Sequence, residues 1–183
     1  MNPPSIGDAL NLAWERFKQD PWPILLMVLI ANLIFLIPIA GIGLGMPGAL
    51  LAGARVVRGQ TPEVDDALVG FKRPLDHIML GLLQLSGVLA CCVGVLVTAP
   101  LFFMGHMLIV EKGLDWQGAM RVCLDQVKPQ LVEWILFYLV LVLFSSLGAL
   151  ACGLGVLVTA PMAAIAMAFA YEGSLGQSPV PTA

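Results

Sequence analysis

Few side chains in this sequence can take part in acid–base chemistry, and most of them lie at the edges of long apolar stretches. His106 is the exception, because it lies inside a stretch from His77 to Val110 without Asp, Glu, Lys or Arg. Ionisable groups within a membrane segment mark proton or ion pathways by default, since burying them is costly. His106 can form a polar cluster with Asp76, His77 and Glu133, which begin or end predicted helices on the same side of the membrane. The interpretation that we favour places all four in the solvated headgroup region.

A serine hydrolase site is the second chemistry that the residues allow. Ser86, in the sequence "QLSG", is a nucleophile and His106 is a base. Hydrolysis needs the base held against the nucleophile, together with an oxyanion hole. We expect Ser86 near the uncharged side of the membrane and His106 near the charged side. A catalytic dyad is therefore not expected.

The cysteines and glycines show no pattern of a cofactor site. No Cys/His spacing typical of zinc or haem occurs, and "GIGLG" lacks the strand and the acidic partner of a dinucleotide site. Cys91 or Cys92 could form a disulfide with Cys152 in an oxidising compartment, but we favour small apolar packing residues. We expect no catalytic residue, no cofactor and no metal, and a protein that is not an enzyme.

The composition indicates an integral membrane protein. Hydrophobic residues make up 59% and charged residues 11%, against about 25% charged in soluble domains, and the mean hydropathy is +0.92. Three uncharged blocks run over 21–54, 77–110 and 134–171. Each is too long for one span of about 20 residues, so we interpret each as a hairpin of two short helices. The first block barely suffices, and a re-entrant hairpin is the alternative there.

All nine Lys and Arg residues lie before or between the blocks. The positive-inside rule then places these segments and both termini in the cytoplasm. We expect a multi-pass protein of the bacterial inner (plasma) membrane. With a net charge of −3 and no basic cluster, nucleic acid is not expected as a partner. The predicted interfacial anchors are Trp14, Trp22, Trp116, Trp134, Lys18, Lys72 and Lys128.

An internal repeat organises the chain. "GVLACCVGVLVTAP" from Gly87 matches "GALACGLGVLVTAP" from Gly148 at an offset of 61 residues, and each block has a Gly six residues before a Pro. The prolines should kink the returning helices, with neighbouring threonines bonding the freed carbonyls. We favour a structural role for these kinks over gating. The hairpin and kink positions are Gly41, Pro47, Gly94, Thr98, Pro100, Gly155, Thr159 and Pro161.

The predicted fold is an all-α membrane protein of three repeats, each an interfacial amphipathic helix followed by a transmembrane helical hairpin, with about six membrane helices in one domain. Apolar residues recur at i, i+3, i+4, i+7, i+8 and i+11 from Ile6 and from Trp116, which is one helix face. The predicted units are repeat 1 (1–60; helix 5–19, hairpin 22–57), repeat 2 (61–114; helix 61–72, hairpin 75–111), repeat 3 (115–175; helix 115–128, hairpin 131–172) and a disordered tail (176–183).

The segments "SIGDALNLAWERFK" and "LGVLVTAP…AFAYEG" resemble small bacterial multi-pass membrane families of unknown function. They are similar in style to the membrane domain fused to glycerophosphodiester phosphodiesterases. This resemblance implies no catalytic or binding residue.

The sequence therefore predicts a non-catalytic scaffold, assembly, membrane-shaping or accessory subunit that acts through its interfacial helices. Expected partners are the lipid bilayer and either further copies of the chain or other membrane subunits. The alternative is a transporter or channel for a lipid-like or small apolar solute, because internal repeats are common in transport folds.

Overall fold

The computed structural model describes residues 5–35, 40–89, 93–150 and 155–176, and within these ranges the regular structure is all helical. Short 3₁₀ and π segments join or end some of the α-helices. The elements are α1 (Ile6–Gln19), α2 (Pro21–Phe35), α3 (Ala40–Val57), α4 (Val64–Ala67), η1 (Val69–Lys72), α5 (Pro74–Leu89), α6 (Val93–Lys112), α7 (Trp116–Val127), η2 (Lys128–Gln130), α8 (Leu131–Leu150), α9 (Val156–Tyr171) and η3 (Glu172–Gly176).

Local capping explains where the amphipathic helices begin. The Ser5 side chain accepts a hydrogen bond from the Asp8 amide at 3.1 Å, and the Asp115 side chain accepts one from the Gly118 amide at 3.0 Å. Such caps satisfy amide groups that have no partner within the helix. The middle segment, predicted as one helix over 61–72, is instead the short α4 followed by the 3₁₀ helix η1.

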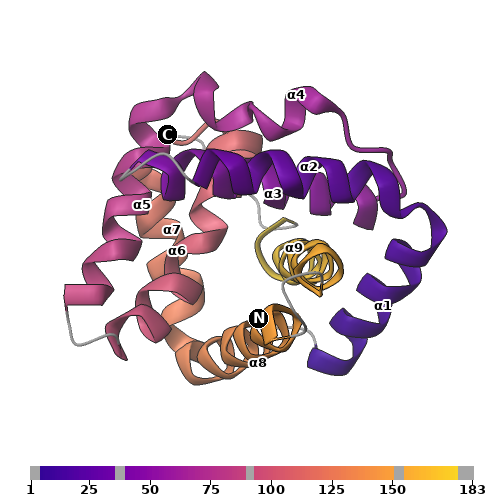
Figure 1. Cartoon of the computed structure of the whole chain (residues 1–183). Helices are drawn as coiled ribbons and strands as arrows, with labels where there is room; N and C mark the ends of the chain where they lie inside the picture. Colours follow the sequence, from indigo (N-terminus) through magenta and orange to yellow (C-terminus); the bar gives the residue numbers. More distant parts are fainter. Residues whose placement is uncertain (1–4, 36–39, 90–92, 151–154, 177–183) are drawn as a thin grey trace.

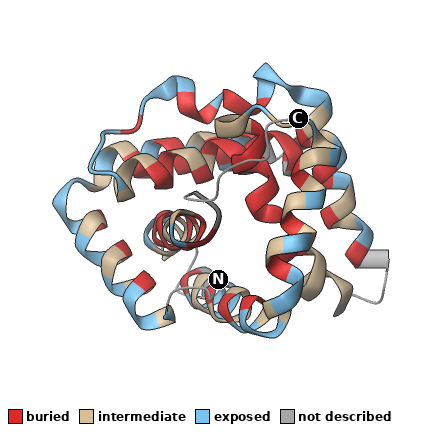
Figure 2. Ribbon diagram, turned by 180° about the vertical axis from the view of Figure 1, so that it is seen from behind, coloured by how far each residue is buried: buried red, intermediate tan, exposed pale blue. Residues whose placement is uncertain are grey.

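The apolar helices pack in consecutive pairs, α2 with α3, α5 with α6, and α8 with α9. Figure 1 shows α9 end-on near the centre, with α1, α2 and α8 around it. Each amphipathic segment packs on a helix outside the pair that follows it in the chain. Thus α1 packs on α9, α4 and η1 pack on α3, and α7 packs on α6. Every residue from 101 to 109 of α6 is buried, and Figure 2 shows buried residues turned toward the interior.

Three helical runs are long and apolar enough to cross a membrane, namely Gly94–Lys112, Trp116–Gly148 and Val156–Ser174. Pro21–Ile34 and Gly43–Val57 are apolar but shorter. These properties support an all-α membrane protein, as the composition predicts. The number of six membrane helices and the threefold repeat stay predictions.

Close approach between helices depends on glycines of α3. A Cβ atom on Gly53 would lie 2.5 Å from the Ala164 carbonyl oxygen of α9, and one on Gly43 would lie 2.5 Å from the His77 carbonyl oxygen of α5. Any larger residue would force these backbones apart, because packed interiors leave no spare volume. Small residues thus allow α3 to contact two neighbours at once.

Candidate functional site

Two histidines meet in the interior between α5 and α6. The Nδ1 atoms of His77 and His106 are 3.1 Å apart, and the rings are stacked with centroids 5.4 Å apart. His77 is 1% exposed and His106 is fully buried. This burial corrects the interpretation that places both in a solvated headgroup region. The reason is the close approach of α3, whose Gly43 lies against the His77 backbone.

Gln84 completes this buried polar cluster, and our sequence reasoning did not assign it to a site. Its side-chain oxygen lies 3.4 Å from Nε2 of His106, while its own backbone carbonyl accepts a hydrogen bond from Thr98 at 2.9 Å. Gln84 follows His77 by seven residues, which places both on one face of α5. This seven-residue spacing is the sequence signal that could have assigned Gln84 to the site. The Gln84 side-chain nitrogen is buried with no partner in the described part of the chain.

The cluster has one consistent arrangement of protons when both rings are neutral. With the Gln84 oxygen facing His106, Nε2 of His106 carries a proton and donates it. Nδ1 of a neutral His106 is then an acceptor, so Nδ1 of His77 must be the donor. If His106 takes a second proton, His77 must switch to the tautomer protonated on Nε2, so that its Nδ1 accepts the Nδ1–H of His106. The pair can therefore hold an added proton by exchanging its donor and acceptor roles.

Asp76 and Glu133, the other members of the predicted cluster, do not join the histidines. Asp76 accepts a hydrogen bond from the Trp116 amide at 3.1 Å and pairs with Arg73 at 3.3 Å. Glu133 lies on α8 with an exposed side chain. The structure thus brings together two of the four predicted residues and adds Gln84.

A second cluster of charges joins the ends of α3, α6 and α9. Arg58 forms ion pairs with both Glu111 and Glu172, and the Tyr171 hydroxyl donates a hydrogen bond to Glu111 at 3.1 Å. Partial burial by itself lowers the pKa of Arg58, but hydrogen bonds and attraction to the two glutamates outweigh burial and raise the pKa above its usual value. We call these residues the three-helix ion cluster, and their side of the molecule the charged end.

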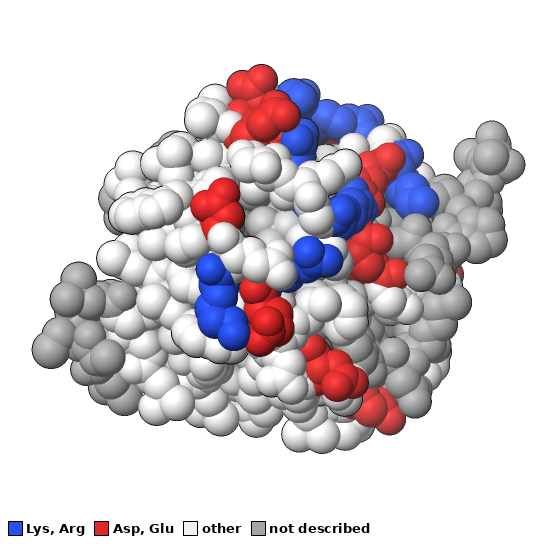
Figure 3. Space-filling view, turned by 90° about the vertical axis from the view of Figure 1, so that its right-hand side faces the viewer, with Lys and Arg blue, Asp and Glu red and all other residues white. Residues whose placement is uncertain are grey.

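Further polar contacts fasten the connecting segments at the charged end. Arg55 pairs with the buried Asp66 at 2.9 Å, which holds α4 against α3. Arg73 donates to the carbonyl oxygens of Gly113 and Leu114 at 2.7 and 2.8 Å. Figure 3 shows charged side chains from the upper edge to the centre and lower right of one face, with uncharged surface to their left and below.

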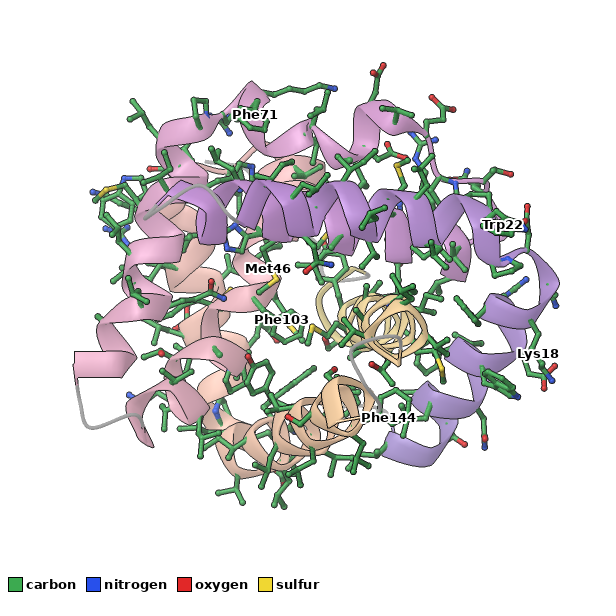
Figure 4. All side chains as sticks on the ribbon, in the orientation of Figure 1. Lys18, Trp22, Met46, Phe71, Phe103 and Phe144 are labelled. Carbon is green, nitrogen blue, oxygen red and sulfur yellow. The ribbon has the colours of Figure 1, made fainter. Side chains whose placement is uncertain are left out.

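The predicted interfacial anchors fall into two groups. Trp14 and Trp22 are exposed, and Figure 4 shows Trp22 and Lys18 at the outer edge. Trp116 is half-buried, and Lys72 and Lys128 are exposed. Trp134 is different: it is 1% exposed and packs on Phe103 and Phe137, with centroids 6.3 and 5.9 Å away. Its prediction as an interfacial anchor is therefore wrong, because α6 covers it.

The predicted kink residues lie in the returning helices. Pro47, Pro100 and Pro161 are inside α3, α6 and α9, and Gly41 is in the first turn of α3. Gly94 lies in the first turn of α6, and Gly155 precedes α9 as its N-cap.

The two threonines bond carbonyls other than those that the prolines release. A proline releases the carbonyl four residues before it. Thr98 instead bonds Gln84 on α5, and Thr159 bonds Gly155 at 3.1 Å. The expectation that they compensate the prolines is therefore wrong. Thr98 links the two helices of its pair.

Metal ligands do not gather in the described ranges: no group of three or more His, Cys, Asp or Glu residues there could hold a metal ion. Cys123 is a free, buried thiol. Cys91, Cys92 and Cys152 lie outside the described residues, and with them the predicted disulfide.

The fold and the buried histidine pair together define an all-helical membrane protein with a polar cluster inside its apolar core. Comparisons with protein-family models, with curated protein sequences and with solved structures give no match. The residues themselves therefore carry the functional argument.

Proposed function

We propose that this protein is a non-catalytic scaffold or accessory subunit of the bacterial inner membrane, and that it binds its partner at the charged end. The observation that carries the proposal is the outward face of α4 and η1. One side of this segment packs on α3 through the buried Ala67 and Gly70. The other side exposes Val64, Leu68 and Phe71.

This exposed row is apolar although it lies among charged residues. It continues into Leu75, which is 76% exposed at the start of α5. An exposed row of large apolar side chains favours a contact with another protein or with the membrane surface. In α1, by contrast, the apolar residues Ala9, Ala13 and Phe17 are buried against the rest of the protein. This difference supports assigning the exposed row of α4 and η1 to a binding partner.

A threefold arrangement of repeats is part of the proposal. The contacts support it, since each amphipathic segment packs on the second helix of the preceding pair and α1 closes the ring on α9. The three-helix ion cluster supports it as well. Arg58, Glu111 and Glu172 each lie eleven residues after the proline of their helix. The charged end is then a platform of three repeat-related segments, facing the cytoplasm by the positive-inside rule.

Site-specific photo-crosslinking tests the proposed function. A benzophenone amino acid replaces Phe71 or Leu68 in cells, and Leu29 on the exposed face of α2 provides the control. We expect a discrete protein adduct from the first two positions, identified by mass spectrometry as a second copy or as another subunit. Lipid adducts alone from all three positions would contradict a protein scaffold.

Transport of a small or lipid-like solute is the second candidate, and the His77–His106–Gln84 cluster favours it. Intramembrane ionisable residues are costly and are found where ions or protons move. Reconstituted vesicles with an internal pH dye test this function. Proton entry that His106→Leu abolishes would favour transport, whereas vesicles with wild-type protein that stay as tight as empty ones would exclude proton conduction.

A further inference from the structure

A cavity of about 160 Å³ lies between four apolar helices, α2, α3, α8 and α9. On one wall α9 contributes small side chains, Ala160, Ala163 and Ala164. Asn32 of α2 and Ser145 of α8 also line it. The cavity belongs neither to the histidine cluster nor to the charged end, and the proposed function does not use it.

The repeat explains why the cavity exists at α9. At the 61-residue offset, Ala163 and Ala164 correspond to Phe102 and Phe103 of α6. Phe102 and Phe103 are buried, and Phe103 packs on Trp134 with ring centroids 6.3 Å apart. Two aromatic rings thus fill the interior beside α6, where α9 has only the methyl groups of Ala163 and Ala164 at the equivalent positions, with Met167 further along the same wall. Voids in protein interiors are otherwise few and small.

The lining selects an apolar occupant. Apart from Asn32 and Ser145, the lining side chains are aliphatic or methionine. The Asn32 amide group already donates to the Val28 carbonyl of its own helix at 2.8 Å. An ion would find no charged partner here, because no lining residue carries a charge. An apolar cavity of about 150 Å³ is large enough to hold benzene, so this cavity fits a segment of about six carbon atoms.

The helices on either side of the cavity face the bilayer. Leu29 and Leu33 of α2 are exposed, as are Leu143 and Leu147 of α8. Exposed leucine rows on apolar helices of a membrane protein contact lipid tails. The hydrocarbon chains of the bilayer are therefore the apolar molecules closest to this cavity.

We propose that the cavity is a lateral binding site for one acyl chain of a membrane lipid, which enters between α2 and α8 and rests on the alanine face of α9. The site recognises chain shape and apolar character, so it takes the tail and leaves the headgroup outside. The bound chain fills the volume that Phe102 and Phe103 fill beside α6.

A photoreactive phospholipid with a diazirine near the end of one acyl chain tests this site. The protein is reconstituted in nanodiscs with this lipid, irradiated and digested, and the adducts are mapped by mass spectrometry. We expect adducts on lining residues of α9 in the wild type. Ala163→Phe introduces the residue found in α6 and should abolish these adducts.

Val158→Phe is the matched control, because it enlarges an exposed residue of the same helix and should leave the lining adducts in place. Ala49→Leu fills the cavity from the α3 wall and keeps the test decisive if Ala163→Phe does not fold. Adducts on the lining that persist in a folded, filled variant would overturn the proposal. Lining residues that stay unlabelled in the wild type would overturn it equally.

Discussion

The contact between α3 and α9 gives the sharpest prediction, the substitution Gly53→Ala. The added Cβ atom would lie 2.5 Å from the Ala164 carbonyl oxygen and 2.8 Å from its carbon. Both neighbours are backbone atoms, so the helices themselves must separate. Overpacking of this kind costs about 1–3 kcal/mol, and the better helix propensity of alanine returns up to about 1 kcal/mol. Because the close contacts are with backbone atoms, we take the upper part of the overpacking range, about 2–3 kcal/mol. The expected net loss is then about 1–2 kcal/mol, a factor of roughly 5–30 in the folded-to-unfolded ratio.

Unfolding in mixed micelles with increasing SDS, followed by circular dichroism, measures this loss. Gly7→Ala is the matched control, because a Cβ atom there meets nothing within 4 Å and α1 gains helix propensity. Gly53→Leu should lower the midpoint further, since its side chain adds bulk at the same backbone contact. If Gly53→Ala unfolds at the wild-type midpoint or later, the backbone contact between α3 and α9 is not as close as described.

Three further predictions concern the clusters and the core. Arg58→Ala should lower the melting temperature, because Glu111 and Glu172 lose the cation that they share; replacing both glutamates by glutamine in the Arg58→Ala background should recover part of this loss. His106→Leu should cost about 1–3 kcal/mol in SDS unfolding, because it leaves buried polar partners without a bond. Phe103→Ala should cost about 3–5 kcal/mol in the same assay by opening a cavity.

The sequence predicts the helical elements well, because their signals are local. Caps at Ser5 and Asp115, and apolar residues at helical spacing, locate α1 and α7. How deeply a side chain is buried cannot be predicted in the same way, because burial depends on which distant helix packs over it. His77 becomes buried through a glycine of α3, more than thirty residues earlier in the chain.

Trp134 illustrates the same limit. A tryptophan at the edge of an apolar block is typical of a membrane interface. Here the covering partner is Phe103 of α6, which no pattern around residue 134 reveals. The number of membrane-spanning helices is equally hard to predict from the length of an apolar block. In the first block, α2 has 15 residues and falls below the length of a full span, whereas α3 has 18 and lies near the lower limit.

The packing of α1 on α9 bears on the order in which the protein is made. The apolar face of α1, with Ala9, Ala13 and Phe17, is covered by α9, which leaves the ribosome long after α1. At about 5–20 residues per second, the segment between them takes roughly 7 to 30 s to synthesise. During that interval the first helix must rest on the lipid surface or on a chaperone. Synthesis of α9 is therefore the event that allows α1 to reach its packed position.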